Sequence, residues 1–198
     1  GASNELDVND IVNLASKINN KICIMQCNTN YTASNDNFKY LNLNYLTHLK
    51  KKFPNLILGL SDHTHGHSSV LGAISLGAKV IEKHFTLSNE LNGPDHKFSM
   101  TPRSWKEMIE RSKELELSLG DGKKKIEENE LDTVVLQRRS IRINKEIKKD
   151  HVIKRDDLNV LRPCPKNAID PRNINKIIGK KINKNLIKDE ILKWEDLD

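Results

Sequence analysis

The chain has 198 residues, of which 36% are hydrophobic, 30% charged and 5% aromatic, and its net charge is +6. This is an ordinary globular composition, and no apolar stretch approaches the roughly 20 residues that a membrane-spanning helix needs. No charged-then-apolar leader opens the chain. The cysteines are odd in number and lack zinc-type or redox spacing, so we expect a cytoplasmic protein without a membrane partner. They are Cys23, Cys27 and Cys164.

The positive charge is concentrated in the later part of the chain, which raises the question of a nucleic-acid partner. The basic residues lie mainly at 123–125, 138–139, 148–149, 180–181 and 184. Acidic residues are interleaved among them, and few aromatic side chains are available to stack on bases. We therefore expect a solvated basic surface and no nucleic acid, which leaves a basic nucleic-acid-binding module as an alternative. An anionic small substrate is compatible with the same charge.

Helical and strand patterns alternate over the first 122 residues. Apolar residues recur at helical spacing within 8–18, 43–53, 70–76 and 105–119. Short apolar runs between these segments predict strands at 22–25 and 56–60, and a run at 79–81 opens a third strand. Pro102 and Gly120 fit the preferred start and end of the last helix. Near-continuous apolar strands between amphipathic helices predict an α/β fold with a parallel sheet covered by helices.

Three strands are too few for a closed barrel, because an eight-stranded (β/α)₈ barrel takes about 250 residues. A parallel sheet of this size would leave an apolar face and open edges exposed. The predicted strands therefore correspond to roughly half a barrel. We expect an N-terminal half-barrel to be missing from this chain or supplied by another one.

The pattern changes after the last predicted helix. Residues 123–137 are charged, lack a clear apolar period and are predicted to be a linker. Short apolar segments then alternate with turn residues, at 140–143, 152–153, 160–161 and 177–178. They predict a small β-rich domain over 138–198, a size that is marginal for independent folding. No internal repeat is expected. The predicted division is thus 1–122, 123–137 and 138–198.

Polar segments follow the predicted strands at 27–31, 61–66 and 82–86. Functional groups in parallel α/β folds gather at the carboxyl ends of the strands. Because side chains alternate along a strand, His63 shares a face with Ser61, and His84 shares a face with Glu82. Adjacent strands could therefore present both histidines at one level.

Two neutral imidazoles suit a divalent ion such as Mn²⁺ or Zn²⁺, with water and a carboxylate completing the coordination. The alternative is that each histidine is a lone, hydrogen-bonded residue at a strand end. His65 and His67 are expected in the loop before the next helix, with Ser68 as a possible N-cap.

Four motifs, in this order, resemble the sialic acid (N-acetylneuraminate) synthase family, which includes legionaminic and pseudaminic acid synthases. They are Gln26–Tyr31, Gly59–Gly66, Ile81–Leu87 and Gly93–His96. Segments 138–140, 148–150, 162–163 and 179–181 resemble the C-terminal antifreeze-like (SAF) domain of the same family. The resemblance implies the C-terminal half of a (β/α)₈ TIM barrel, a small β-rich SAF domain and a domain-swapped homodimer.

The resemblance also implies an activity: condensation of phosphoenolpyruvate with an N-acetylhexosamine, such as N-acetylmannosamine, to a nonulosonic acid, with release of phosphate. It implies a divalent cofactor, Mn²⁺ or Mg²⁺, bound by His63 and His84, which act in catalysis together with Glu82. The implied substrate-binding residues are Thr29 and Ser61 for phosphoenolpyruvate, Tyr31, Glu82 and Asp95 for the hexosamine, and Arg162, reaching into the partner's site, for the N-acetyl group. Two alternatives stay open: Glu82 and Asp95 form surface ion pairs, or the chain is a non-catalytic binding or dimerisation remnant.

Overall fold

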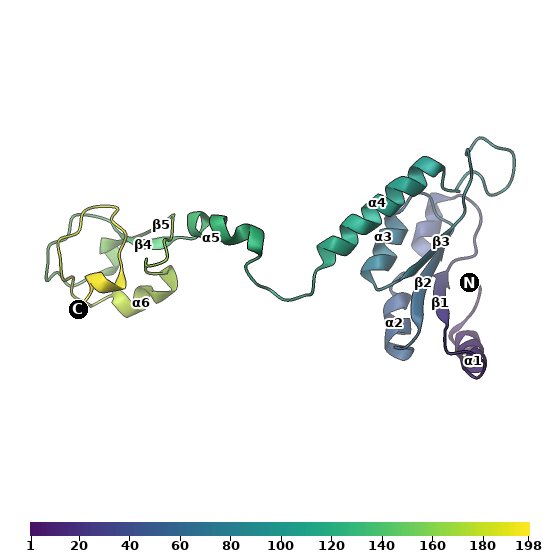
Figure 1. The fold of residues 1–198 in the computed structure, drawn as a ribbon, viewed down its shortest axis with the longest axis horizontal. Coiled ribbons are helices and arrows are strands. Elements are labelled where there is room, and N and C mark those ends of the chain that lie inside the picture. The colour runs from purple at the N-terminus through teal and green to yellow at the C-terminus, as the bar shows by residue number, and fades with distance from the viewer. The chain divides into compact units, whose positions relative to one another are not determined.

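A computed structural model describes residues 1–198, which form two compact units, Gly1–Lys123 and Lys124–Asp198 (Figure 1). The first unit contains a parallel sheet with helices, and the second is a small unit with a two-stranded antiparallel sheet. None of the helices combines the length and the apolar character that crossing a bilayer requires.

A three-stranded parallel sheet of order β1-β2-β3 forms the centre of the first unit. The strands are β1 (Cys23–Cys27), β2 (Ile57–Asp62) and β3 (Val80–Lys83). The helices are α1 (Glu5–Ser16), α2 (Tyr45–Lys52), α3 (Ser68–Ser75) and α4 (Pro102–Leu119), with a 3₁₀ helix at Asn35–Tyr40. The predicted α/β architecture with a parallel sheet is therefore confirmed. Thr101 caps α4, and Pro102 and Gly120 mark its two ends as predicted.

Helices α2 and α3 cover one face of the sheet (Figure 1). Leu58 and Leu60 of β2 are buried in a cluster with residues of these helices and the turn after α3, namely Leu46, Leu49, Ala73 and Ala78. Because side chains alternate along a strand, Ser61 points to the opposite face. The apolar half of β2 thus anchors the sheet to its helices and leaves the other face for polar residues.

The two outer strands leave open edges, as predicted for a sheet of three strands. Helix α1 adds uncovered apolar surface, because Leu6, Ile11 and Leu14 are 71%, 63% and 63% exposed. Val12 is the one residue of α1 that is buried. The apolar face of this helix is therefore only partly packed against the rest of the chain.

Two strands extend further toward their carboxyl ends than their apolar runs, so polar motifs begin inside the sheet. The apolar runs end at Met25 and Leu60, whereas the strands continue to Cys27 and Asp62. The run at 79–81 was expected to open a third strand, and that strand ends at Lys83. Ladder hydrogen bonds join backbone groups and do not require apolar side chains. The N-cap of α3 is His67, not Ser68 as expected, and Ser68 is the first helical residue.

The second unit pairs β4 (Ser140–Ile143) with β5 (Leu158–Leu161) and contains two short helices, α5 (Leu131–Gln137) and α6 (Ile174–Ile177). Four 3₁₀ helices lie at Glu128–Glu130, Arg155–Asp157, Pro171–Asn173 and Trp194–Asp196. Helix α5 falls in the segment expected to be a linker, and Val135 O accepts a hydrogen bond from Cys164 N at 2.9 Å. This hydrogen bond ties α5 to the segment that follows β5.

The core of the second unit is built from a sequence repeat, so the expectation of no internal repeat was wrong. Residues 143–158 and 182–197 share the pairs Asn-Lys and Lys-Asp and the pattern Lys-x-x-Asp-Leu at equivalent positions. Asp157 and Asp196 are each 1% exposed, and each ends a 3₁₀ turn. Their carboxylates accept equivalent backbone N–H groups at 2.8 and 2.9 Å, and lie 2.7 and 2.8 Å from Lys145 and Lys184. The repeat is hard to recognise in the sequence because differing residues separate its short identical segments.

The buried carboxylate of Asp157 predicts an acid-sensitive second unit. Burial opposes its ionisation, but the Lys145 ammonium, His151 and the Lys154 N–H together hold its pKa down to about 2. This folded-state pKa is below the ordinary 3.8, so the stabilisation is complete above about pH 4 and is lost as the pH falls toward 2. We expect the carboxylate to contribute roughly 2 kcal/mol to the free energy of unfolding at pH 7.

Urea unfolding of the Asp157→Asn variant tests this, followed by Trp194 fluorescence in a Trp105→Phe background. The stability difference from the parent should be present at pH 7 and should shrink toward zero near pH 2. Asp156→Asn, at an exposed neighbouring position, is the control and should change little. A difference that is the same at both pH values would contradict the assigned pKa.

Candidate functional site

His63 and His84 lie side by side at the carboxyl ends of β2 and β3. The parallel register pairs Ser61 with Glu82, so the two histidines follow at matching positions. Their ring centroids are 5.1 Å apart. The structure therefore brings together the two imidazoles that strand alternation predicted at one level, rather than leaving each alone.

Two aromatic rings complete this group. The ring of Tyr31, which follows β1, has its centroid 4.1 Å from that of His63 and 5.5 Å from that of His84. The ring of Phe98 is 5.0 Å from His84 and almost fully buried. We call Tyr31, His63, His84 and Phe98 the histidine cluster. Phe98 was not predicted as a site residue, and its apolar surface limits the space beside His84.

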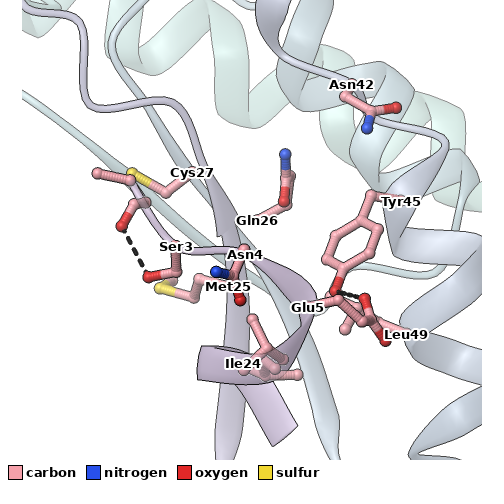
Figure 2. A pocket seen from close by; sticks show the side chains of 13 residues that line it. Ser3, Asn4, Glu5, Ile24, Met25, Gln26, Cys27, Asn42, Tyr45 and Leu49 are labelled. Carbon is pink, nitrogen blue, oxygen red and sulfur yellow. Dashed lines mark hydrogen bonds between the residues drawn. The ribbon is translucent and has the colours of Figure 1, made fainter.

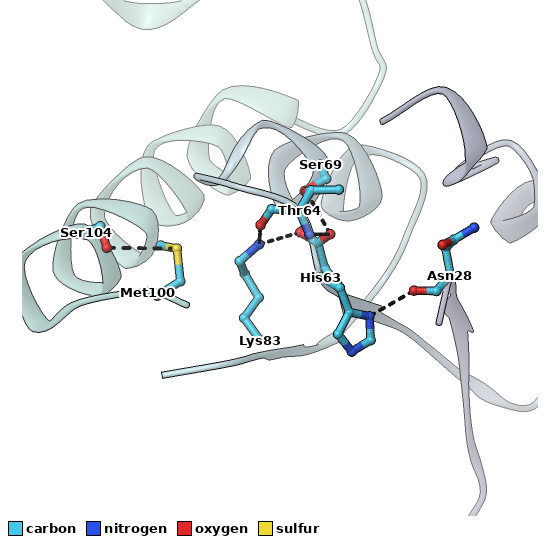
Figure 3. Close-up of polar contacts among 8 residues, drawn as sticks. Asn28, His63, Thr64, Ser69, Lys83, Met100 and Ser104 are labelled. Atoms are coloured by element: carbon cyan, nitrogen blue, oxygen red, sulfur yellow. Dashed lines mark hydrogen bonds and ion pairs between the residues drawn. The ribbon is translucent and has the colours of Figure 1, made fainter. Parts of the chain in front are cut away.

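One ring nitrogen of His63 is hydrogen-bonded to the backbone, and this bond fixes the protonation state of the other ring nitrogen. Its Nδ1 is 2.9 Å from the carbonyl oxygen of Asn28 (Figure 3). A carbonyl only accepts, so Nδ1 carries the proton and the lone pair of Nε2 remains free. Burial lowers the pKa of His63, which favours the neutral imidazole. A neutral ring whose second nitrogen is held by a backbone carbonyl is the usual form of a metal-binding histidine.

The donor set of this chain fits a divalent ion with two protein ligands. His84 Nδ1 is 3.5 Å from Asp95 Oδ2, and no group of three or more His, Cys, Asp or Glu side chains is arranged to hold a metal. Two imidazoles with water or substrate oxygens in the other positions suit a borderline divalent ion. His65 is not part of this arrangement, because its Nε2 is 2.7 Å from Ala33 O.

Ser61 and Glu82 form a hydrogen-bonded pair on the same face of the sheet as the histidines. Ser61 Oγ donates to Glu82 Oε1 at 2.7 Å. Ser61 is buried, whereas Glu82 is exposed, so one carboxylate edge remains open to a ligand. Glu82 forms no ion pair, whereas Asp95 is within ion-pair distance of His84.

Two predicted residues stand apart from this group. Thr29 is exposed beyond the end of β1, and its side chain forms no hydrogen bond. Arg162 belongs to the second unit, where it follows β5 and is exposed without an ion pair. Its carbonyl oxygen accepts a bond from Arg142 Nη2 at 3.4 Å. The residues that the structure does bring together are Tyr31, Ser61, His63, Glu82, His84 and Asp95.

A buried ion pair behind the histidine cluster was missed by sequence reasoning. Lys83 Nζ is 2.6 Å from Asp62 Oδ2, and their side chains are 1% and 0% exposed. Figure 3 shows Lys83 reaching Thr64, whose carbonyl oxygen accepts a hydrogen bond from Nζ. Burial lowers the pKa of Lys83 while the Asp62 carboxylate opposes that shift. The pair was overlooked because strand alternation was applied only to the face that carries the histidines, and Asp62 and Lys83 lie on the other face. Opposite charges at equivalent strand ends were the available indication.

A cavity of about 320 Å³ lies along β1 and contains neither histidine (Figure 2). Residues 1–5, β1 and α2 line it. Tyr45 donates to Glu5 Oε2 at 2.5 Å, and hydrogen bonds from Lys52, Tyr45 and His48 hold the pKa of Glu5 at about 2. The cavity follows an edge strand of the sheet and is separate from the chemistry of the histidine cluster.

Comparisons with known proteins match both units. The family described as "NeuB family" matches residues 1–124, and the "SAF domain" matches residues 138–198. The predicted fold class, a barrel-type α/β domain followed by an SAF domain, is thereby confirmed. An N,N'-diacetyllegionaminic acid synthase of Legionella pneumophila is 36% identical over 92% of this chain and 50% of its own length. A Campylobacter jejuni protein of the same name is 34% identical over 98% and 57%.

A solved structure agrees with these matches. The N-acetylneuraminic acid (sialic acid) synthetase of Leptospira borgpetersenii has a TM-score of 0.60 and 25% identity, over 68% of this chain and 46% of its own. The chain thus spans about half the length of the curated relatives that it matches.

The burial of His63 predicts an unusual titration. Its imidazole should titrate below the ordinary value of 6.5, because burial disfavours the charged ring. The unfolded chain then binds this proton at a higher pH than the folded chain, so protonation of His63 works against folding as the pH falls below 6.5. Imidazole NMR signals followed against pH measure this, with His63→Gln assigning the resonance. A midpoint at or above 6.5 would show that the ring is not desolvated as described.

Proposed function

The chain belongs to the NeuB family, and we propose that it supplies the metal-binding part of a nonulosonic acid synthase active site. The proposed reaction joins phosphoenolpyruvate to an N-acetylhexosamine, such as N-acetylmannosamine, and releases phosphate. The observation that carries this proposal is the pairing of His63 with His84 beside the Ser61–Glu82 hydrogen bond. The names of the relatives support a sugar with one or two acetamido groups.

His63 and His84 would hold a divalent ion, Mn²⁺ or Mg²⁺, which would supply Lewis-acid polarisation of the sugar's aldehyde oxygen. In the proposed reaction, carbon 3 of phosphoenolpyruvate attacks the aldehyde carbon, and the aldehyde oxygen takes up a proton to become a hydroxyl. Water adds at carbon 2 of the resulting cation with loss of a proton, and C–O cleavage of this adduct releases phosphate and leaves a ketone at carbon 2. Ser61 would lie near phosphoenolpyruvate, and Glu82 would accept a hydrogen bond from a sugar hydroxyl while Ser61 fixes its carboxylate.

The remaining residues are proposed to bind substrate around this pair. Tyr31 is 48% exposed beside His63, so its hydroxyl and ring edge are available to the hexosamine. Asp95 lies beside His84 with an open carboxylate and would bind a sugar hydroxyl. Thr29 would contact phosphoenolpyruvate from the end of β1. Phe98 would exclude water from one side of the cluster.

A complete barrel requires strands beyond the three present, so we propose that an N-terminal half-barrel completes the site. The open edge of β1 and the exposed apolar residues of α1 support this proposal. The purified chain should release no phosphate from phosphoenolpyruvate and N-acetylmannosamine with Mn²⁺. Co-expression with the N-terminal half of the Legionella relative should restore measurable release, tested also with a diacetamido hexosamine. Full turnover by the chain alone would contradict a split site, and no turnover in any assembly would favour a non-catalytic remnant.

Histidine variants in the active assembly are the controls for this experiment. His63→Ala or His84→Ala should abolish activity and metal dependence while the fold persists. His65→Ala should be much milder, because His65 contacts Ala33 O rather than the cluster. Equal loss in all three variants would contradict a site built on two histidines.

Arg162 is proposed to bind the N-acetyl group in the site of a partner subunit within a domain-swapped homodimer. Its guanidinium is exposed and free of ion pairs, and a charge-assisted hydrogen bond to an acetamide carbonyl is worth roughly 1.5–3 kcal/mol. Arg162→Ala should therefore raise the KM for the hexosamine about tenfold or more, and that for phosphoenolpyruvate much less. Arg155→Ala, at another exposed arginine of the same unit, should change neither.

Subunit mixing tests the swap itself. A dimer of one His84→Ala and one Arg162→Ala subunit has one site with both groups intact, so activity should return to at most about half per dimer. Recovery of nothing in confirmed hybrid dimers would show that Arg162 does not serve the other subunit.

A further inference from the structure

We propose that the buried Asp62–Lys83 ion pair is a positioning element that fixes the geometry of the two metal-binding histidines. This inference rests on the proposed function of His63 and His84. Asp62 ends β2 directly before His63, and Lys83 ends β3 directly before His84. The parallel register places Asp62 opposite Lys83, so a single ion pair joins the two strands that carry the imidazoles.

The ion pair and the histidines lie on opposite faces of the same strand ends. Side chains alternate along a strand, so Ser61 and Glu82 share the front face while Asp62 and Lys83 point behind it. On the rear face, Lys83 Nζ lies 2.6 Å from Asp62 Oδ2. On the front face, Ser61 Oγ lies 2.7 Å from Glu82 Oε1. The two strand ends are thus held together on both faces immediately before each histidine.

Further hydrogen bonds hold the backbone on both sides of His63. Thr64 N and Oγ1 donate to Asp62 Oδ1 at 2.9 and 2.8 Å, and Lys83 Nζ donates to Thr64 O at 2.7 Å. Ser69 Oγ at the start of α3 also donates to Asp62. His63 therefore lies between two residues that the pair fixes, and α3 anchors them.

Because its two charges are buried, the Asp62–Lys83 pair is better explained by a positioning role than by stabilisation alone. Removing both ions from water is costly, and apolar residues of similar volume often give equal or greater stability. What apolar residues do not supply is the fixed geometry of five hydrogen bonds around one carboxylate and one ammonium. In this site that geometry determines where the backbone of His63 and His84 lies.

Precise placement matters more here because the site has two neighbouring imidazoles and no group of three or more ligand-type side chains arranged to hold a metal. Without a third protein ligand nearby, a displacement of either ring is not compensated. Functional sites require their groups within about 0.5 Å of the productive geometry. Replacing a group that hydrogen-bonds a metal ligand typically changes metal affinity by about 10- to 100-fold, and we expect a change of this size for the pair that fixes the residues next to both histidines.

The test is a Mn²⁺ titration of the 198-residue chain, followed by paramagnetic broadening of the imidazole NMR signals. In the unmodified chain, His63 and His84 should broaden at lower Mn²⁺ concentrations than His65 and His67. In Lys83→Met, the concentration needed should rise at least about tenfold. Lys79→Met replaces an exposed lysine next to the start of β3 and should leave the titration unchanged.

A second variant guards against loss of the fold in Lys83→Met, which leaves a buried carboxylate unpaired. Asp62→Asn combined with Lys83→Met removes both charges, and circular dichroism reports whether it folds. A folded double variant with weakened Mn²⁺ binding supports the positioning role. A folded variant with unchanged binding overturns it, as does unfolding of both variants, which would make the pair a general requirement for the fold. If the unmodified chain shows no selective broadening, the metal site and the proposed function fail instead.

Discussion

The parallel register between β2 and β3 is the constraint on which the candidate site depends. It sets Ser61 opposite Glu82 and Asp62 opposite Lys83, and alternation then sends the first pair forward and the second behind the sheet. The buried leucines of β2 hold this register, because a slip of one residue would move them away from α2 and α3. A core interaction therefore decides which polar groups meet at the strand ends, and the chemistry of the site follows from packing.

The second unit is small, and its fold depends on polar contacts that fix its turns. Its repeat places a buried aspartate at the end of each of two 3₁₀ turns, and each carboxylate fixes a turn that borders the apolar core. Ser140 Oγ donates to Pro163 O at 2.7 Å, and Arg142 contacts Arg162 O, so the backbone that carries Arg162 is held while its guanidinium stays exposed. A rigid base under a free side chain suits a residue that is proposed to bind a ligand.

Strand periodicity was enough to predict the α/β sheet and the meeting of His63 with His84, because both follow from local alternation and parallel pairing. It missed the Asp62–Lys83 pair, since alternation was followed only on the face that carries the histidines, whereas both charges point to the other face. It also missed the contact of Phe98 with His84, because the path of a long loop is set by tertiary hydrogen bonds such as Thr86 N to Met100 O at 2.9 Å. Helix α5 was missed because its apolar residues at helical spacing, Leu131, Val134 and Val135, span little more than one turn beside a charged stretch. The Arg162 proposal came from family resemblance, and no local pattern in the sequence predicts it.

The proposed site requires a divalent ion bound by the imidazoles of His63 and His84. Anomalous diffraction from crystals of the chain assembled with an N-terminal half-barrel and Mn²⁺ tests this most directly. We predict one anomalous peak bonded to His63 Nε2 and to one nitrogen of His84, with His63 Nδ1 still donating to Asn28 O. A Mn²⁺ peak at His65, His67 or the cavity along β1, with none between His63 and His84, would contradict metal binding by these two histidines.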